Sequence, residues 1–330
     1  MILVLSDLYL PFPGGAERLI YNLARDIRSR GVSVHVLTGY ENAQQFDGPP
    51  ISIEPIGVFD SQPQGAEIVK AYLNDLAPEA VLVHHLYAHQ FKNELIASGI
   101  PFVQIVLNGE RIPEAAFAVH ISDWVAERAG FVKDLDLIIT PPVFDDVIAE
   151  THEHAIGFIK PIAHKGVDLV YDLAVSFPNR KFVVLRGEWQ TLEIMSDLPN
   201  VEYMEPVKDI RDFYRRVDLV LMPSRSEDAG TVAQECALNR IPCISSNSDG
   251  LVQTNAGGVR LDRDDFLGFR RAINELDNDG LRDVVVERQL RYLAEKRQED
   301  VLAGFTWRIT NIPPHDPNLI TVAQQAKFSS

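Results

Sequence analysis

The chain is predicted to be an α/β protein with two domains, each built on a doubly wound parallel sheet. Its 330 residues exceed the length of one average domain, and 46% of them are hydrophobic, which is enough for two cores. Short apolar runs alternate with stretches of helical period, as in parallel sheets whose strands are joined by helices. The pattern starts again after Thr140-Pro141-Pro142, which predicts the second domain.

The first domain is predicted to span residues 1–142. It opens with a β-α-β pattern, because an apolar run at 2–5 is followed by a helical stretch at 16–27, a stop at Gly31 and a second apolar run at 32–37. A helix is expected near 68–76, and further strands are expected at 80–84, 102–107 and 118–121.

The second domain is predicted to span residues 143–307. Pro141 and Pro142 interrupt both helices and sheet pairing, so we expect a linker there. Strands are expected at 155–159, 181–185, 201–203, 219–222 and 241–245, and helices at 167–177, 210–217, 231–238 and 281–303. Residues 308–330 are expected to form a loose tail. Two such domains are expected to face each other across a cleft.

Composition argues against several classes of function. The formal net charge of −16 and the pI of about 5.0 disfavour binding to nucleic acid and strong association with anionic membranes. No apolar run approaches the roughly 20 residues of a spanning helix, and the apolar start is too short for a signal sequence. We therefore expect a soluble, cytoplasmic protein.

Cysteine and histidine usage argues against a disulfide framework and a metal site. Cys236 and Cys243 are the only cysteines, one on a predicted helix and the other on the following strand. Two histidine clusters lack thiolate partners and the His-Glu-x-x-His frame of zinc sites; they are His84, His85 and His89, and His152 and His154.

The first motif, Gly14-Gly15, joins the first strand to the first helix. Paired glycines allow the backbone to approach an anion closely, and a helix N-terminus presents free N–H groups to phosphate. The alternative is a plain tight turn, because the spacing fits neither a Walker loop nor a Gly-x-Gly-x-x-Gly turn.

The second motif gathers Lys160, His164 and Lys165 between a strand and a helix that opens at Gly166. Cations at the end of a strand suit a diphosphate, especially in an acidic chain. The alternative is a solvated surface loop, and His164 is expected to be incidental.

The third motif is SEDAGTVAQE, in which Glu227 and Glu235 flank a turn of small residues. A helix that starts near Gly230-Thr231 would present its first N–H groups to phosphate, and Glu235 would lie about one turn further on, roughly 6 to 8 Å along the axis. That offset resembles the distance from the diphosphate of a nucleotide to its ribose. The alternative is a capping box formed by Thr231 and Gln234, with acidic residues favoured by the helix dipole.

Together these motifs resemble a large family of retaining glycosyltransferases with the GT-B fold, in which two Rossmann-like domains face a cleft. The family signature is a pair of glutamates separated by seven residues, the spacing of Glu227 and Glu235. Three further blocks resemble the family's Pro-Ser-x-x-Glu, Glu-Ala-Met and Pro-Val-Val-Ala sequences: Pro223-Ser224-Arg225-Ser226-Glu227, Glu235-Cys236-Ala237-Leu238 and Ile241-Pro242-Cys243-Ile244-Ser245. Arg186-Gly187-Glu188 stands where the family has Gly-x-Gly. Near the end of the chain, Phe305-Thr306-Trp307 also resembles the family's sequence.

The resemblance implies a retaining hexosyltransferase that needs no cofactor or metal and moves a sugar from a nucleotide-diphosphate donor, such as a UDP- or GDP-sugar, to a saccharide or small-molecule acceptor. The second domain would bind the donor and the first the acceptor. By position, Lys165 and the backbone at Gly230, Thr231 and Val232 would hold the diphosphate, with Glu235 on the ribose and Glu227 on the donor sugar. Gly14 and Gly15 would close on the phosphates, and Lys160 and Arg186 would add positive charge.

The sequence departs from the family pattern at three positions. Phe158 follows Gly157 where an arginine is common, which leaves Lys160 as a substitute. Asn108 stands where a histidine commonly meets the donor sugar; an amide still forms hydrogen bonds, although it carries no proton. The alternative for Asn108 is a turn with Gly109. Asp228-Ala229-Gly230 replaces Gly-Phe-Gly and adds negative charge near the sugar.

The acceptor side is less clearly specified. Polar residues follow strand ends in the first domain, where ligands of α/β proteins bind: His84, His85, Tyr87, His89, Glu110 and Arg111. His84 is the candidate catalytic residue among them, and the alternative is a structural histidine. A nucleotide-sugar epimerase and a non-catalytic sugar-nucleotide-binding protein remain alternative functions for the whole chain.

Overall fold

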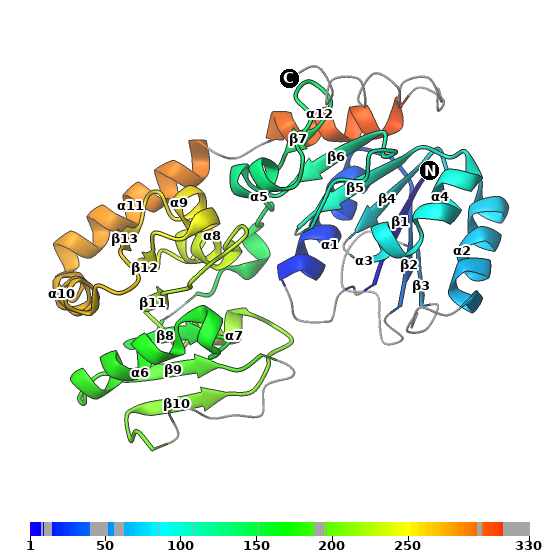
Figure 1. Cartoon of the computed structure of the whole chain (residues 1–330). Coiled ribbons are helices and arrows are strands. Elements are labelled where there is room, and N and C mark those ends of the chain that lie inside the picture. The colour runs from blue at the N-terminus through cyan, green and yellow to red at the C-terminus, as the bar shows by residue number, and fades with distance from the viewer. Residues whose placement is uncertain are drawn as a thin grey trace. The chain divides into compact units, whose positions relative to one another are not determined.

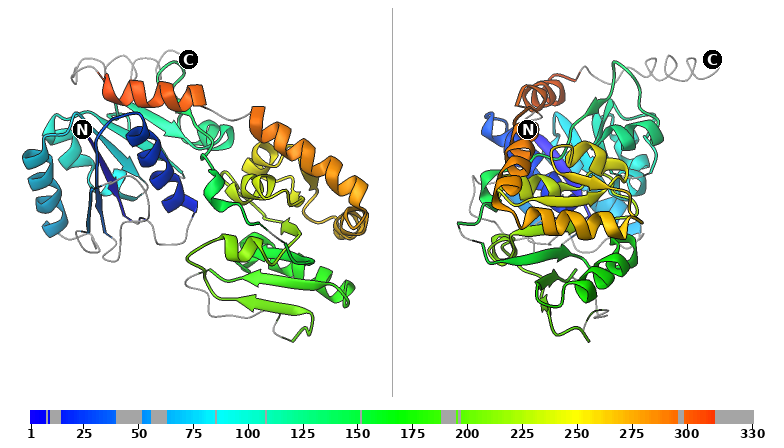
Figure 2. Two further views of the ribbon diagram at one scale, coloured as in Figure 1. Left: turned by 180° about the vertical axis from the view of Figure 1, so that it is seen from behind. Right: turned by 90° about the vertical axis from the view of Figure 1, so that its left-hand side faces the viewer.

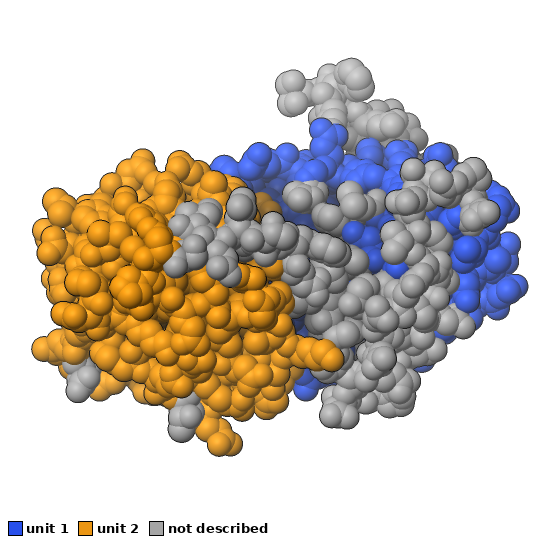
Figure 3. All heavy atoms as spheres, turned by 90° about the horizontal axis from the view of Figure 1, so that it is seen from below, with its two compact units in different colours: residues 1–142, 298–330 blue, residues 143–297 orange. Residues whose placement is uncertain are grey.

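The chain folds into two compact units of α/β type. The computed structural model describes residues 1–7, 9, 15–39, 52–55, 63–84, 86–107, 109–150, 152–187, 195, 197–295 and 299–312. The first unit comprises Met1–Pro142 and Gln298–Ser330, and the second comprises Val143–Arg297, coloured blue and orange in Figure 3. No helix within the described ranges is both long and apolar enough to cross a membrane.

The first unit is built on a parallel sheet. Within the described residues the sheet has seven strands in the order β3-β2-β1-β4-β5-β6-β7. In chain order these strands are β1 (Ile2–Ser6), β2 (Val34–Thr38), β3 (Ser52–Pro55), β4 (Ala80–His84), β5 (Phe102–Val106), β6 (Phe117–His120) and β7 (Leu137–Ile138). The central strand β1 is buried along its whole length, and Val4 pairs with Val36 on one side and with Leu82 on the other. Burial on both faces explains why these strands are nearly continuous apolar runs.

Helices cover both faces of this sheet. The helices are α1 (Gly15–Ser29), α2 (Pro63–Leu76), α3 (Leu86–Gln90), α4 (Lys92–Ser98), α5 (Asp123–Arg128) and α12 (Glu299–Thr310). Helix α1 lies on one side of the sheet and α2 on the other (Figure 1, Figure 2). Leu3, Leu5 and Val83 pack against residues of α2 and α4 in one hydrophobic cluster.

The second unit repeats the arrangement. Its described strands are β8 (Ala155–Ile159), β9 (Lys181–Leu185), β10 (Val201–Met204), β11 (Leu219–Met222), β12 (Cys243–Ser246) and β13 (Val259–Leu261), in the order β10-β9-β8-β11-β12-β13. Its helical segments are η1 (Asp145–Val147), η2 (Ala163–Lys165), α6 (Val167–Ser176), α7 (Arg211–Tyr214), α8 (Thr231–Leu238), α9 (Asp249–Thr254), α10 (Phe266–Leu276) and α11 (Asp279–Glu295).

Alternate residues of the second sheet serve two separate cores. Leu221 and Ile244 pack with α6 and α10, whereas Val220 and Cys243 pack with α7 and α8. Because successive side chains of a strand point to opposite faces, both faces of the sheet are covered, as in a doubly wound fold. The predicted α/β class with two doubly wound parallel sheets is confirmed.

The end of the chain differs from the prediction. The second domain was expected to run to residue 307, but the second unit ends at Arg297 and α12 belongs to the first unit. Phe305 packs edge-on against Phe117, and Arg308 donates a hydrogen bond to the Leu135 carbonyl at 2.6 Å. Helices α11 and α12 cover the described part of the helix expected at 281–303, and α12 takes in the first residues of the expected tail at 308–330. Residues 313–330 lie outside the described residues.

Strand order gives each sheet a switch point where the chain reverses its direction of winding. In the first unit the neighbours β1 and β4 flank this point, and in the second unit β8 and β11 do so. The connections that follow two such strands leave on opposite faces of the sheet, as α6 and α8 do in the second unit. Ligands of open α/β sheets bind at such points.

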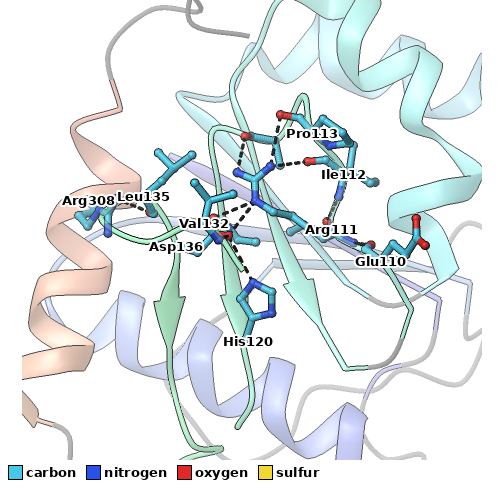
Figure 4. Close-up of polar contacts among 12 residues, drawn as sticks. Glu110, Arg111, Ile112, Pro113, His120, Val132, Leu135, Asp136 and Arg308 are labelled. Atoms are coloured by element: carbon cyan, nitrogen blue, oxygen red, sulfur yellow. Dashed lines mark hydrogen bonds and ion pairs between the residues drawn. The ribbon is translucent and has the colours of Figure 1, made fainter. Parts of the chain in front are cut away.

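A buried ion pair stabilises the first unit. Arg111 donates from Nε to both carboxylate oxygens of Asp136, at 3.0 and 2.8 Å, and His120 Nε2 lies 3.4 Å from Asp136 Oδ2 (Figure 4). Backbone N–H groups of Ala118 and Val132 also donate to Asp136, each at 2.8 Å. The pair thus ties the chain before β6 to the chain before β7.

The pKa of Asp136 reflects this environment. Burial by itself raises the pKa of the carboxyl, but the hydrogen bond with His120, the charge of Arg111 and the two backbone N–H groups outweigh it and lower the pKa. A lowered pKa in the folded state means that the ionised carboxylate contributes stability above the unfolded pKa. That contribution is lost as the pH falls through the folded pKa.

We predict that Asp136→Asn lowers the free energy of unfolding by about 3 kcal/mol at pH 7, because the change leaves Arg111 buried without its counterion. The difference from wild type should narrow as the pH falls from about 4, where the carboxyl of the unfolded chain takes up a proton, toward the lowered pKa of the folded state. Urea unfolding at several pH values measures both effects. Asp134→Asn, the same chemical change at an exposed position, is the control. Equal stability of the two variants at pH 7 would contradict the assignment.

Candidate functional site

Most of the described candidate residues of the second unit gather at its switch point. The segment 160–166 follows β8 and the segment 223–230 follows β11, and these strands are neighbours in the sheet. The backbone N–H of Arg225 donates to the His164 carbonyl at 2.9 Å, which joins the two segments directly. The second and third sequence motifs therefore form one site.

Gly166 allows this close approach. Its φ is 86°, and a Cβ at this position would lie only 2.2 Å from the carbonyl oxygen of Pro223. Both the left-handed backbone and the missing side chain are therefore required. Gly250 contacts the same loop on another side, because its backbone N–H donates to the Glu227 carbonyl at 2.7 Å and a Cβ there would meet the Asp228 oxygen at 2.4 Å.

Lys165 and Glu227 form an ion pair at this point. Lys165 Nζ lies 2.6 Å from both carboxylate oxygens of Glu227, and the Ser224 hydroxyl donates to Glu227 Oε2 at 2.9 Å. The side chains are 25% and 14% exposed, respectively, so solvent reaches both partners. An anion that enters the site would meet the cation of this pair.

Helix α8 begins where the sequence predicts, at Thr231. Gly230 is the N-cap residue with φ 62°, and a Cβ on it would lie 3.2 Å from Glu227 Cγ, so the Glu227 side chain runs beside the start of the helix. Because Gly230 rather than Thr231 is the N-cap, Thr231 and Gln234 are not placed as a capping box. The first N–H groups of a helix have no partner within the helix, so those of Thr231 and Val232 are presented at the helix start, beside which the Glu227 side chain runs.

Glu235 lies one turn into α8 and is only 5% exposed. The Tyr214 hydroxyl donates to Glu235 Oε2 at 2.7 Å. The sequence thus predicts the position of Glu235 on its helix but not this contact.

Lys160 and Arg186 lie at the carboxyl ends of the neighbouring strands β8 and β9. Lys160 has φ 60°, and its Cγ would lie 3.2 Å from a Cβ on Gly187. The Arg186 guanidinium lies over the Tyr203 ring, 5.3 Å from its centre, and donates to Glu205 at 2.9 Å. The structure therefore brings Lys160 close to the Arg186-Gly187 turn.

In the first unit, His84 ends β4 beside the end of β1. It is 1% exposed, its Nδ1 is hydrogen-bonded to the Ser6 hydroxyl at 3.1 Å, and Asp7 Oδ1 lies 3.8 Å away. The Nδ1 atom of the ring therefore has its hydrogen-bond partner within the first unit, as expected of a structural histidine. A catalytic role for His84 remains a prediction.

The other candidate residues of the first domain differ in their burial. Tyr87 and Arg111 were expected where ligands bind at the strand ends, but Tyr87 packs in the hydrophobic core and Arg111 is buried against Asp136. His89 and Glu110 are exposed, and Gly15 begins α1. Gly14, His85, Asn108 and Glu188 lie outside the described residues.

The described histidines and aspartates form no cluster suited to a metal. His152 contacts the Tyr214 carbonyl and His154 contacts Asp218. The spacing Asp-x-Asp, which a metal motif could use, occurs at 134–136, 262–264 and 277–279, but Asp136 is paired with Arg111, Asp264 with Arg263 and Asp277 with Arg180. Within the ranges described, no group of three or more His, Cys, Asp or Glu side chains is arranged to hold an ion.

Sequence reasoning missed two residues that contact the site, Tyr214 and Ser224. Ser224 lies in the Pro-Ser-x-x-Glu block, so its position three residues before Glu227 was the available signal. Tyr214 lies on α7 and meets Glu235 only through the tertiary fold. Its one signal in the sequence is its type, since a buried tyrosine usually finds a partner for its hydroxyl.

A comparison with protein families places this site in a known sequence context. Residues 153–279 match the model of the glycosyl transferases of group 1. The matched region holds Lys160, Lys165, Arg186 and the whole segment from Glu227 to Glu235. A search of curated protein sequences gave no match.

Solved structures resemble the whole chain. A glycosyltransferase from Rickettsia africae ESF-5 aligns with a TM-score of 0.76 at 12% identity, covering 97% of this chain and 98% of that one. HepE from Anabaena, in complex with UDP-glucose, aligns with a TM-score of 0.74 at 16% identity over 94% and 98% of the two chains. Sucrose-phosphate synthase from Thermosynechococcus elongatus aligns with a TM-score of 0.71 at 12% identity over 100% of both chains. At these identities the likeness shows the fold, and the predicted GT-B fold is confirmed.

We predict that Gly166→Ala destabilises the second unit more than its backbone angle alone requires. Gly130 has φ 80° with nothing within 4 Å of an added Cβ, so Gly130→Ala should cost only about 1 to 2 kcal/mol for the left-handed conformation. Gly166→Ala should cost about 3 kcal/mol or more, because its Cβ also collides with backbone. Urea unfolding of both variants measures the difference. Equal losses would show that the contact with Pro223 is not as close as described.

Proposed function

We propose that the protein is a retaining glycosyltransferase. It moves a sugar from a nucleotide-diphosphate donor, such as a UDP- or GDP-sugar, to a hydroxyl of a saccharide or small-molecule acceptor. The observation that carries the proposal is the meeting of Lys165, Glu227 and the N-terminus of α8 at the switch point of the second sheet. This site lies inside the region that matches the group 1 glycosyl transferases.

The second unit supplies groups suited to each part of such a donor. Lys165 and the N–H groups of Thr231 and Val232 would bind the diphosphate, since a cation and a helix N-terminus both stabilise phosphate. Glu235, one turn further along α8, would accept the ribose hydroxyls. Lys160 and Arg186 would add positive charge at the ends of β8 and β9.

Glycosyl transfer places negative charge on the departing nucleoside diphosphate as the bond to the sugar breaks. Lys165 and the amides of α8 would stabilise that charge, which lowers the barrier without protonation of the leaving group. In the family that the sequence resembles, the leaving phosphate helps to deprotonate the acceptor hydroxyl. Glu227 would accept hydrogen bonds from the donor sugar. The roles of Gly14, Gly15, Asn108 and His84 in the first unit are part of the same proposal.

Glu227 and a diphosphate would compete for Lys165. In the structure the lysine ammonium contacts both oxygens of Glu227, and both side chains are partly exposed. Binding of a diphosphate requires Lys165 to share its charge or to turn away from Glu227. The released carboxylate is then free to accept from the sugar.

We predict opposite effects of Glu227→Gln on binding and on transfer. Affinity for UDP or GDP should rise roughly threefold to tenfold, because Lys165 is freed and one negative charge is removed from the site. Turnover with the complete donor should fall about 100-fold, because the sugar loses a charged hydrogen-bond acceptor. Calorimetry and a transfer assay measure the two effects.

The control for this experiment is Glu287→Gln, which removes one partner of the exposed pair with Arg240 in the same unit. It should alter neither quantity. If Glu227→Gln also left both nucleotide affinity and turnover unchanged, the proposed site would be wrong. Absence of transfer by wild type from every UDP- and GDP-sugar tested would count against the function itself.

We also predict that transfer needs no divalent metal, because protein cations and amides neutralise the leaving diphosphate. Enzyme dialysed against a chelator should keep its turnover within about twofold when the chelator stays in the assay. Addition of magnesium or manganese is the matched comparison. Loss of turnover that only a divalent ion restores would contradict the prediction.

A further inference from the structure

A tyrosine holds the carboxylate of Glu235 from inside the protein. The Tyr214 hydroxyl donates to Glu235 Oε2 at 2.7 Å; Tyr214 is completely buried and Glu235 is 5% exposed. Tyr214 ends α7, which precedes β11, and Glu235 lies on α8, which follows it. The contact therefore connects the helix that precedes β11 in the chain to the helix that follows it.

The tyrosine itself is rigidly placed. Its ring packs in the hydrophobic cluster that includes Val217, Met222 and Cys236, and it meets the Phe213 ring edge-on at 5.4 Å. Its backbone carbonyl is hydrogen-bonded to His152 Nδ1 at 2.9 Å. A hydroxyl held in this way fixes the direction from which Glu235 Oε2 receives its hydrogen bond.

The backbone of Glu235 is fixed as well. Asn239 Nδ2 donates to the Glu235 carbonyl at 2.9 Å and to the Val147 carbonyl at 3.1 Å. Asn239 Oδ1 accepts from the Ala149 N–H at 2.7 Å, so the chain just before β8 holds the end of α8 in place. The carboxylate and the backbone of Glu235 are thus each held by a side chain from outside α8.

The two carboxylate oxygens of Glu235 differ in their hydrogen bonding. Across the part of the chain that the structure describes, Glu235 Oε1 accepts no hydrogen bond, whereas Oε2 accepts from Tyr214. A bond to one oxygen limits rotation of the carboxylate about its last torsion, so the other oxygen is held in one orientation. Preorganisation of this kind reduces the entropy lost when a ligand binds.

We propose that Tyr214 is a positioning residue that orients Glu235 to accept the ribose hydroxyls of the donor. This inference rests on the proposed function, in which Glu235 binds the ribose. Tyr214 touches no part of the donor in this scheme and acts only through the carboxylate. A purely structural tyrosine would support the fold of the second unit without any preference for ribose hydroxyls.

The test measures binding of UDP and GDP and of their 2′,3′-dideoxy counterparts by calorimetry. Wild type should bind at least one of the two natural nucleotides more tightly than its dideoxy form, and Glu235→Ala should abolish that preference. Tyr214→Phe keeps the ring and removes the hydroxyl. It should lower affinity for the natural nucleotide about tenfold, the size of effect seen when a residue that orients a metal-binding side chain is removed, and leave affinity for the dideoxy form unchanged. The matched control is Tyr171→Phe, since the Tyr171 hydroxyl donates to the Asp197 carboxylate on the surface of the same unit.

Each other result overturns the inference in a distinguishable way. If Tyr214→Phe lowers affinity for both forms equally, the tyrosine supports the fold and not the ribose contact. If it changes neither affinity while Glu235→Ala abolishes the preference, the ribose role of Glu235 stands and that of Tyr214 falls. If wild type binds neither UDP nor GDP, the inference fails together with the proposed function.

Discussion

The close backbone approach between Gly166 and Pro223 decides where the charged groups of the second unit lie. Because a Cβ at residue 166 would overlap the Pro223 carbonyl, the loops after β8 and β11 are in direct contact, and the bond from Arg225 to His164 fixes their register. Gly250 contacts the loop after β11 from α9. Lys165 and Glu227 extend from these two loops, so their meeting follows from backbone packing as much as from their charges.

The ion pair of Arg111 with Asp136 and that of Lys165 with Glu227 differ in their exposure to solvent. Asp136 is buried and receives hydrogen bonds from Arg111 and two backbone N–H groups. Separation of Arg111 from Asp136 would leave a buried charge without a partner, so this pair is not available to a ligand. Lys165 and Glu227 are partly exposed, and an anion can reach the lysine from solvent. The first pair suits a permanent structural role and the second suits exchange with a charged ligand.

Much of the fold and part of the site were predictable because the signals are local. Alternating apolar runs and helical stretches predict the two parallel sheets, and the Gly230-Thr231 boundary predicts where α8 begins. Contacts between distant segments were not predictable in this way. The bond from Tyr214 to Glu235, the pair of Arg111 with Asp136 and the return of α12 to the first unit all depend on strand order, which periodicity does not encode. The pattern near residue 300 shows a helix but does not show which core its apolar side packs against.

The two glutamates of the motif are separated by seven residues, yet their surroundings suit different tasks. Glu227 is held by a cation and a serine hydroxyl at the start of α8, and its partner Lys165 is the group that an incoming diphosphate would attract. Glu235 is held by a neutral tyrosine hydroxyl from the core, a partner that a phosphate has no reason to displace. A charge partner that can be exchanged makes Glu227 responsive to what is bound, whereas a neutral buried partner keeps Glu235 in one orientation. In a donor site, the first property suits contact with a sugar that must leave, and the second suits contact with a ribose that stays in place during transfer.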